Sequence, residues 1–412
     1  MRGMAKRSTP YPDPASADRQ WRAFNSICAV LNPFAGAQGL TPQDSAATDW
    51  AEVGKFADFH GIRPALHRAL SAMPAANPAM AELQTRLADF QRGHRFRVMQ
   101  TTAQIVELAR AFEAVGIAAL FFKGAMLGEQ IYGGAQFREF NDVDILVRPA
   151  QRRAAEQVLV SLDFQPIIQD PRFRAAFFGY LRQHNFRHQA SRTTVDLHWG
   201  FVGHGPFPIN LEQALDSAVR VELAGTAIAV PDAAAQALIL AGHGHKEDWA
   251  AFGWVLDFAT FAARNPALRW DRIAAAARRQ NCLEPLLGAV LLVERLFGHT
   301  VDKGLARLAA ERSTVTSNVD RIIVNLATLQ QRSFEADLMG GFNLCETPVQ
   351  RAAMALRLMT TPTVGDYEAM PLAPRWWWLY RLTRPMRLLA RAVQGRKPTQ
   401  SALWDQANAP RT

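Results

Sequence analysis

Two aspartates, Asp142 and Asp144, stand two residues apart in the apolar segment DVDILV at 142–147. Alternate residues of a strand point to the same side, so a strand here places both carboxylates next to each other on one face. Two ionised carboxylates in that arrangement repel each other unless a cation lies between them. An isolated pair of this kind can equally be the solvated edge of a half-buried strand, so the pattern alone leaves both interpretations open.

A third carboxylate, Asp196, lies in the segment TTVDLHW at 193–199, where apolar residues alternate with Asp196 and His198. If the polar face of this strand meets that of Asp142 and Asp144, three carboxylates converge. They then offer enough oxygen ligands for one or two Mg²⁺ (or Mn²⁺) ions. His198 shares the face of Asp196, and we expect it either to orient the substrate or a metal-bound water, or to be a structural hydrogen-bonding group.

Residues suited to binding phosphate occur on both sides of these strands. Lys123 and Gly124 lie where an apolar run at 117–122 gives way to a helical pattern, and free backbone N–H groups at such a helix start can meet phosphate. Glycine is also common at these turns for conformational reasons alone. Further along, His243 and Lys246 lie one helical turn apart, a spacing suited to holding a triphosphate or pyrophosphate.

The composition is that of a folded globular protein with two or three compact units. Of its 412 residues, 49% are hydrophobic and 20% are charged, and the formal net charge is +9. Arginine supplies nearly all of the basic side chains. Without a concentrated basic face, this excess does not predict general nucleic-acid binding.

The three cysteines and the apolar runs bear on the compartment. Cys28, Cys282 and Cys345 are far apart and lack the CxxC spacing of zinc or redox sites. The N-terminus has no apolar stretch of signal-peptide length, and no apolar run approaches the roughly 18 residues of a membrane span. We therefore expect reduced thiols in a cytoplasmic protein without integral membrane association.

The order of the expected elements predicts a small α/β unit inside a mostly helical chain. In chain order these elements are a helix in 97–115, a strand at 117–122 buried on both faces, a helix at 124–134, a half-buried strand at 142–147, a helix at 150–162, strands around 184–190 and 193–199, and helices from 232 to 394. The expected regions are a disordered leader at 1–20, an N-terminal helical region at 21–115, an α/β core at 116–231, a C-terminal helical domain at 232–395 and a flexible tail at 396–412.

The segment 375–397 is strongly amphipathic. It holds seven basic residues and no acidic one, with an apolar stripe that includes Trp378, Leu382, Met386 and Leu389. Such a pattern is typical of a membrane-surface helix, or of a helix packed on its own domain with its arginines in solvent. We expect the second arrangement.

Together, these motifs resemble the bacterial nucleotidyltransferase-like family of the polymerase-β superfamily. In that superfamily, a glycine pair or Gly-Ser opens a helix, a DxD pair lies on the next strand, and a third carboxylate lies on a later strand. This sequence matches those positions in order with Gly124 and Ala125, with Asp142 and Asp144, and with Asp196. Further matches are Tyr132, Arg138, His243, Gly244, Lys246, Trp249 and Asp257, and the similarity covers most of residues 45–390.

The resemblance implies a polymerase-β-like mixed sheet and an enzyme that transfers a nucleoside monophosphate from an NTP to an acceptor, releasing pyrophosphate. It implies that Asp142 and Asp144 hold the metal bound to the triphosphate, while Asp196 helps to hold a second metal. The implied nucleotide-binding residues are Lys123, Gly124, Ala125, Arg138, His243 and Lys246. The acceptor stays open among a small metabolite, a sugar, a peptide or protein side chain, and an RNA end.

Two other functions are compatible with the sequence. Ala125 lacks the hydroxyl group or the backbone freedom found at that position elsewhere in the superfamily, so the fold could be an inactive binding or regulatory module. The second alternative is a metal-dependent phosphohydrolase, although no tandem His-Asp pair is present. Its candidate ligands would be His198, His243, His245 and Asp257.

Overall fold

The computed structural model describes residues 14–35, 41–168, 170, 182–200, 211–280, 282–329, 348–362 and 364–394. Residues 1–13 of the expected disordered leader lie outside these described residues. The expected flexible tail at 396–412 also lies outside them. Residues 14–20 instead begin the first helix, α1 (Pro14–Val30). Its proline sits at the first helical position, where a missing N–H costs no hydrogen bond.

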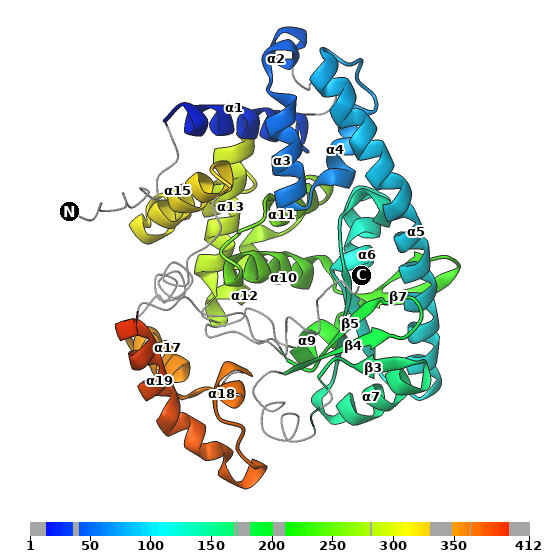
Figure 1. The fold of residues 1–412 in the computed structure, drawn as a ribbon, viewed down its shortest axis with the longest axis vertical. Coiled ribbons are helices and arrows are strands. Elements are labelled where there is room, and N and C mark those ends of the chain that lie inside the picture. Colours follow the sequence, from blue (N-terminus) through cyan, green and yellow to red (C-terminus); the bar gives the residue numbers. More distant parts are fainter. Residues whose placement is uncertain are drawn as a thin grey trace, which may run out of the picture.

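A five-stranded mixed sheet forms the centre of the α/β unit (Figure 1). Its strands, in spatial order, are β1 (Ala119–Phe122), β2 (Asp142–Val147), β5 (Thr194–His198), β4 (Gln183–His188) and β3 (Phe164–Pro166). β2 and β5 run parallel, and the other neighbours are antiparallel. The expectation of a small mixed sheet within a mostly helical chain is confirmed.

Helices cover both faces of this sheet. On one face, apolar side chains of β1, β2 and β5 pack against the long helix α5 (Pro78–Ala114) and against α7 (Arg152–Ser161). On the other face, Leu120, Phe122 and Leu146 pack with α9 (Leu211–Asp216) and α10 (Ala233–Lys246).

This arrangement corrects the expectation for the strand at 142–147. β2 is not half-buried, because α10 covers the face that was expected to meet solvent; only Asp142, at its start, is partly exposed. The apolar run that contains β1 is buried on both faces, as expected.

The remaining helices form one core that draws on both ends of the sequence. Residues of α1, α3 (Trp50–His60) and α4 (Arg63–Leu70) share this core with residues from α10 to α15. The other helices of this layer are α2 (Pro42–Ala47), α11 (Phe252–Arg264), α12 (Trp270–Arg279), α13 (Leu283–Phe297), α14 (Lys303–Ala310) and α15 (Ser313–Ala327). The structure thus joins two helical regions that the sequence suggested were separate.

The helix expected at 124–134 is irregular. It consists of one α-turn, α6 (Gly124–Leu127), and a π-helical turn, η1 (Gly128–Tyr132), and the short 3₁₀ helix η2 (Ala135–Phe137) follows. The π turn places Tyr132 so that its hydroxyl group donates a hydrogen bond of 3.0 Å to Asp257 in α11. Single π turns of this kind often occur at functional sites.

Sequence reasoning missed one hairpin, β6 (Val219–Leu223) and β7 (Thr226–Val230), which packs beside β1. Its two-residue turn, Ala224–Gly225, has positive φ angles of 47° and 76°, as tight hairpins require. The alternating segments VRVEL and TAIAV around Ala-Gly were the available signal.

Four C-terminal elements form a group at one end of the molecule: α17 (Pro348–Thr360), α18 (Val364–Ala369), the 3₁₀ helix η4 (Pro374–Leu379) and α19 (Tyr380–Gln394) (Figure 1). The expected orientation of the helix in 375–397 is wrong. Leu382 is 60% exposed, whereas Arg384 is buried against Asp366. Across the described residues, none of the helices has the length and apolarity needed to cross a bilayer.

A buried ion pair joins the sheet unit to the helical layer. Arg138, four residues before β2, donates to Asp257 through Nη2 at 2.8 Å, and both side chains are largely enclosed. Removing one partner of such a pair leaves an unpaired buried charge.

We therefore expect Asp257→Ala to lower the free energy of unfolding by about 3–5 kcal/mol, as measured by denaturant titration. The matched control is Asp271→Ala, which removes the carboxylate of an exposed Arg269–Asp271 pair and should leave stability nearly unchanged. Equal effects of the two substitutions would contradict a structural role for the buried pair.

Candidate metal and nucleotide site

The parallel pairing of β2 with β5 brings the candidate metal ligands together. Its register sets Asp144 opposite Asp196 and Leu146 opposite His198. One ligand atom from each of Asp144, Asp196 and His198 lies within 4.8 Å of the others, and His198 Nε2 is 3.0 Å from Asp144 Oδ1. Asp196 therefore shares a sheet face with Asp144, which is the condition on which the convergence of the carboxylates depended.

The turn between β1 and α6 closes over the start of β2. Gly124 has a φ of 44°, and a Cβ atom at this position would lie 2.9 Å from the backbone oxygen of Asp142. Only glycine fits here without displacing β2. The preceding residue, Lys123, places Nζ 3.5 Å from Asp144 Oδ1, so one ammonium group faces the carboxylates.

The carboxylates do not tolerate full ionisation in this enclosure. Burial, together with the charges of Asp142 and Asp144, raises the pKa of Asp196 to about 8. Burial and the charge of Asp144 raise the pKa of Asp142 to about 6. For Asp144, burial alone would raise the pKa, but Lys123 and the hydrogen bond with His198 outweigh it and lower the pKa.

This donor set suits a divalent cation. Raised pKa values at Asp142 and Asp196 mean that the cluster holds more negative charge than its surroundings stabilise, and a cation can replace the protons. Carboxylate oxygens suit Mg²⁺ and Mn²⁺, and an imidazole nitrogen can join them around the softer Mn²⁺. Asp144, Asp196 and His198, with Asp142 beside them, therefore fit such an ion.

Helix α10 brings a second group of residues to the same face of the sheet. His243 is half-buried, and the loss of solvation, reinforced by the positive charges of Lys123 and Lys246, holds its pKa well below the usual range. His198 also has a lowered pKa, caused first by burial. Lys246 is the last residue of α10 and lies 3.2 Å from a carboxylate oxygen of Glu247. Lys123 thus faces the carboxylates directly, whereas the charge of Lys246 acts on the neighbouring His198 and His243.

One protein-family model, described as an uncharacterised nucleotidyltransferase, matches residues 46–298, more than half of the chain. The chain belongs to this family. The matched segment contains the sheet, the β1–α6 turn and α10, and it ends before the C-terminal helices α14 to α19. No protein of curated function matches the sequence significantly.

Within this nucleotidyltransferase fold, two predicted nucleotide-binding residues are engaged elsewhere. The guanidinium of Arg138 is bonded to both oxygens of Asp257, an arrangement that is at odds with a phosphate contact because the donors already have a partner. The side chain of Ala125 lies in the apolar core beside α5. A hydroxyl group at position 125 would therefore point into the core, and only the backbone there can meet a nucleotide.

The phosphohydrolase ligand set does not assemble in the nucleotidyltransferase core. Within the described ranges, Asp144, Asp196 and His198 are the one group of three that lies close enough to share a metal. Asp257 instead bonds to Arg138 and Tyr132. Of the four residues proposed for that alternative, only His198 belongs to the metal-capable group.

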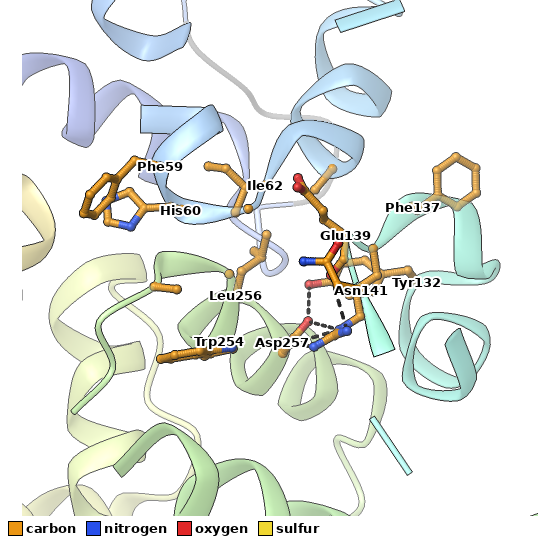
Figure 2. Close-up of a pocket in the computed structure, with 15 residues that line it drawn as sticks. Phe59, His60, Ile62, Tyr132, Phe137, Glu139, Asn141, Trp254, Leu256 and Asp257 are labelled. Carbon is orange, nitrogen blue, oxygen red and sulfur yellow. Dashed lines mark hydrogen bonds and ion pairs between the residues drawn. The ribbon is translucent and has the colours of Figure 1, made fainter. Parts of the chain in front are cut away.

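A pocket of about 200 Å³ is lined in part by Arg138 and Asp257. Figure 2 shows Asn141 and Glu139 on one side of it and Trp254 on another. Asn141 directly precedes Asp142, and the indole ring of Trp254 packs edge-on against His243, with ring centroids 5.1 Å apart. The pocket therefore borders the carboxylate site without sharing its metal-binding residues.

The raised pKa of Asp196 predicts a pH dependence of stability in metal-free protein. Its pKa of about 8 in the folded state compares with 3.8 for an unperturbed aspartate, so the folded protein holds a proton that the unfolded chain releases. The stabilising contribution of this proton is complete below about pH 4 and is lost as the pH rises to about 8.

In EDTA, the wild type should accordingly lose stability between about pH 5 and pH 8, whereas Asp196→Asn should not, because the amide does not ionise. The free energy of unfolding of the variant minus that of the wild type should therefore rise over this range. Denaturant titrations at several pH values measure this difference. The control Asp89→Asn, at a 59% exposed side chain on α5, should show no such trend. A difference for Asp196→Asn that is independent of pH would contradict the crowding of these carboxylates.

Proposed function

We propose that this protein transfers a nucleoside monophosphate from an NTP to a hydroxyl or amine group of an acceptor. The acceptor atom bonds to the α-phosphorus and gives up its proton to solvent, the bond from that phosphorus to the bridging oxygen breaks, and pyrophosphate leaves with the electron pair. The observation that carries the proposal is the convergence of Asp144 and Asp196 on one sheet face, in a chain that belongs to a nucleotidyltransferase family.

Divalent metal is part of this proposal. Asp142, Asp144 and Asp196, with His198 beside them, would hold Mg²⁺ or Mn²⁺. A bound cation would neutralise the negative charge that develops on the phosphates. The protein's own contribution is to keep these side chains fixed on rigid strands, because positioning and charge account for most of phosphoryl-transfer catalysis.

The two lysines would act on the leaving group. Lys123 already lies 3.5 Å from Asp144, so its charge stands where a metal-bound triphosphate would enter. Lys246 is 40% exposed, which leaves its ammonium group accessible to a phosphate tail from the solvent side. Hydrogen bonds from charged donors to phosphate are among the stronger polar contacts, so both residues favour a triphosphate over an uncharged substrate.

The positions of the other predicted residues are compatible with an active site. Gly124 allows the β1–α6 turn to approach β2 closely, which keeps the turn's backbone beside the carboxylates. The side chain of Ala125 points away from the carboxylates, so its missing hydroxyl group leaves the metal ligands unaffected. The regulatory-module alternative therefore gains no support from this position.

The direct test supplies purified protein with each α-labelled NTP, Mg²⁺ or Mn²⁺ and a cell extract, and follows the label into an acceptor. We expect transfer by the wild type and a loss of roughly a hundredfold or more for Asp144→Asn, which removes a charge from the centre of the ligand group. The exposed control Asp89→Asn should transfer label at the wild-type rate.

Near-normal transfer by Asp144→Asn would show that this carboxylate is not needed for the reaction. The substitution relieves repulsion with Asp142, but it also removes the charged partner of Lys123 and His198, so some loss of stability is expected. Circular dichroism of the variant separates a catalytic loss from misfolding.

A further inference from the structure

An exposed apolar stripe runs along η4 and α19. Its members are Trp378, Leu382, Met386 and Leu389, spaced three or four residues apart, and each side chain is between 49% and 70% exposed. Trp376, at 47% exposure, extends the apolar surface toward the start of η4. Residues at this spacing share one side of a helix, so they form a continuous strip and not scattered contacts.

The opposite side of α19 fastens the helix to the protein through polar groups. Arg384 donates to Asp366 of α18 at 2.6 Å, and Arg387 Nε reaches the other oxygen of the same carboxylate at 2.7 Å. Tyr380 is fully buried, and its hydroxyl group donates to the backbone oxygen of Met370. Turning the apolar stripe inward would break these buried bonds, so the helix is fixed with its apolar side outward.

The charge of this region is strongly one-sided. From residue 369 to residue 404 the sequence has no Asp or Glu, but it has six arginines and one lysine. Arg384 and Arg387 are paired with Asp366, whereas the side chains of Arg375 and Arg381 are exposed. Exposed Arg375 lies beside Trp376, with its guanidinium carbon 5.9 Å from the ring centroid. An exposed strip of leucine, methionine and tryptophan with exposed arginines near its start, Arg375 and Arg381, has the composition of surfaces that lie against a membrane.

We propose that the stripe formed by Trp376, Trp378, Leu382, Met386 and Leu389 docks this protein on an anionic lipid surface. The apolar side chains enter the boundary between headgroups and acyl chains, and the exposed Arg375 and Arg381 attract anionic headgroups. Nucleic acid also attracts arginine, but a phosphate backbone offers nothing for the apolar strip to bury against. Membrane binding requires neither nucleotide nor acceptor, so its test does not depend on whether the protein catalyses the transfer reaction.

Co-sedimentation of the full-length protein with vesicles tests this proposal. We expect binding to vesicles of phosphatidylcholine mixed with phosphatidylglycerol, weaker binding to phosphatidylcholine alone, and weakening of the first by added salt. The double variant Met386→Ser/Leu389→Ser, at side chains 70% and 65% exposed, should reduce the partition coefficient by about tenfold or more.

The matched control is Phe96→Ser/Met99→Ser on α5, which removes two apolar side chains that are 61% and 69% exposed. It should bind vesicles as the wild type does, and thermal melting should show both double variants folded. Absence of wild-type binding to the anionic vesicles, or equal losses in the two double variants, would overturn the proposal. So would sedimentation showing a wild-type dimer that the Met386→Ser/Leu389→Ser variant abolishes, because the stripe would then join two copies of the chain.

Discussion

The parallel pairing of β2 with β5 is the constraint on which the rest of this site depends. It sets Asp144 directly across from Asp196, where backbone hydrogen bonds hold both strands and both side chains project from the same face. The resulting crowding is unfavourable in the absence of a cation, as the raised pKa values of Asp142 and Asp196 reflect. The sheet therefore maintains an unfavourable arrangement of negative charge. A divalent metal ion that carries a phosphorylated substrate would neutralise it.

The helices around the sheet keep this arrangement enclosed. α10 lies over the carboxylate face with Ile239 in the apolar core and His243 near the carboxylates, so a single helix both buries the sheet and supplies site residues. The contacts of Arg138 and Tyr132 with Asp257 attach the adjoining helix α11 to the segment that leads into β2. Through these contacts the helical layer, built from both ends of the sequence, supports the geometry of the strands.

Local pattern was sufficient to predict the residues of β2 but not their surroundings. DVDILV at 142–147 is the observed strand, and its alternation gave the faces of Asp142 and Asp144 correctly. That Leu146 is buried beneath α10 depends on a helix about ninety residues away, which no local period reports. The adjacency of β2 and β5 is equally non-local; the alternation of the two segments allowed it, and the family resemblance favoured it. The ion pair of Arg138 was not foreseen because its partner, Asp257, lies 119 residues distant. The orientation of α19 was predicted wrongly because the buried Asp366 draws the arginines of this helix inward.

The central claim is that Asp144 and Asp196 share a divalent cation. Anomalous diffraction from crystals containing Mn²⁺ tests it most directly, because the scattering locates the ion without assuming any activity. The account predicts an anomalous peak within coordination distance of both carboxylates, with His198 beside it. A peak at another group of residues, with none between Asp144 and Asp196, would contradict it.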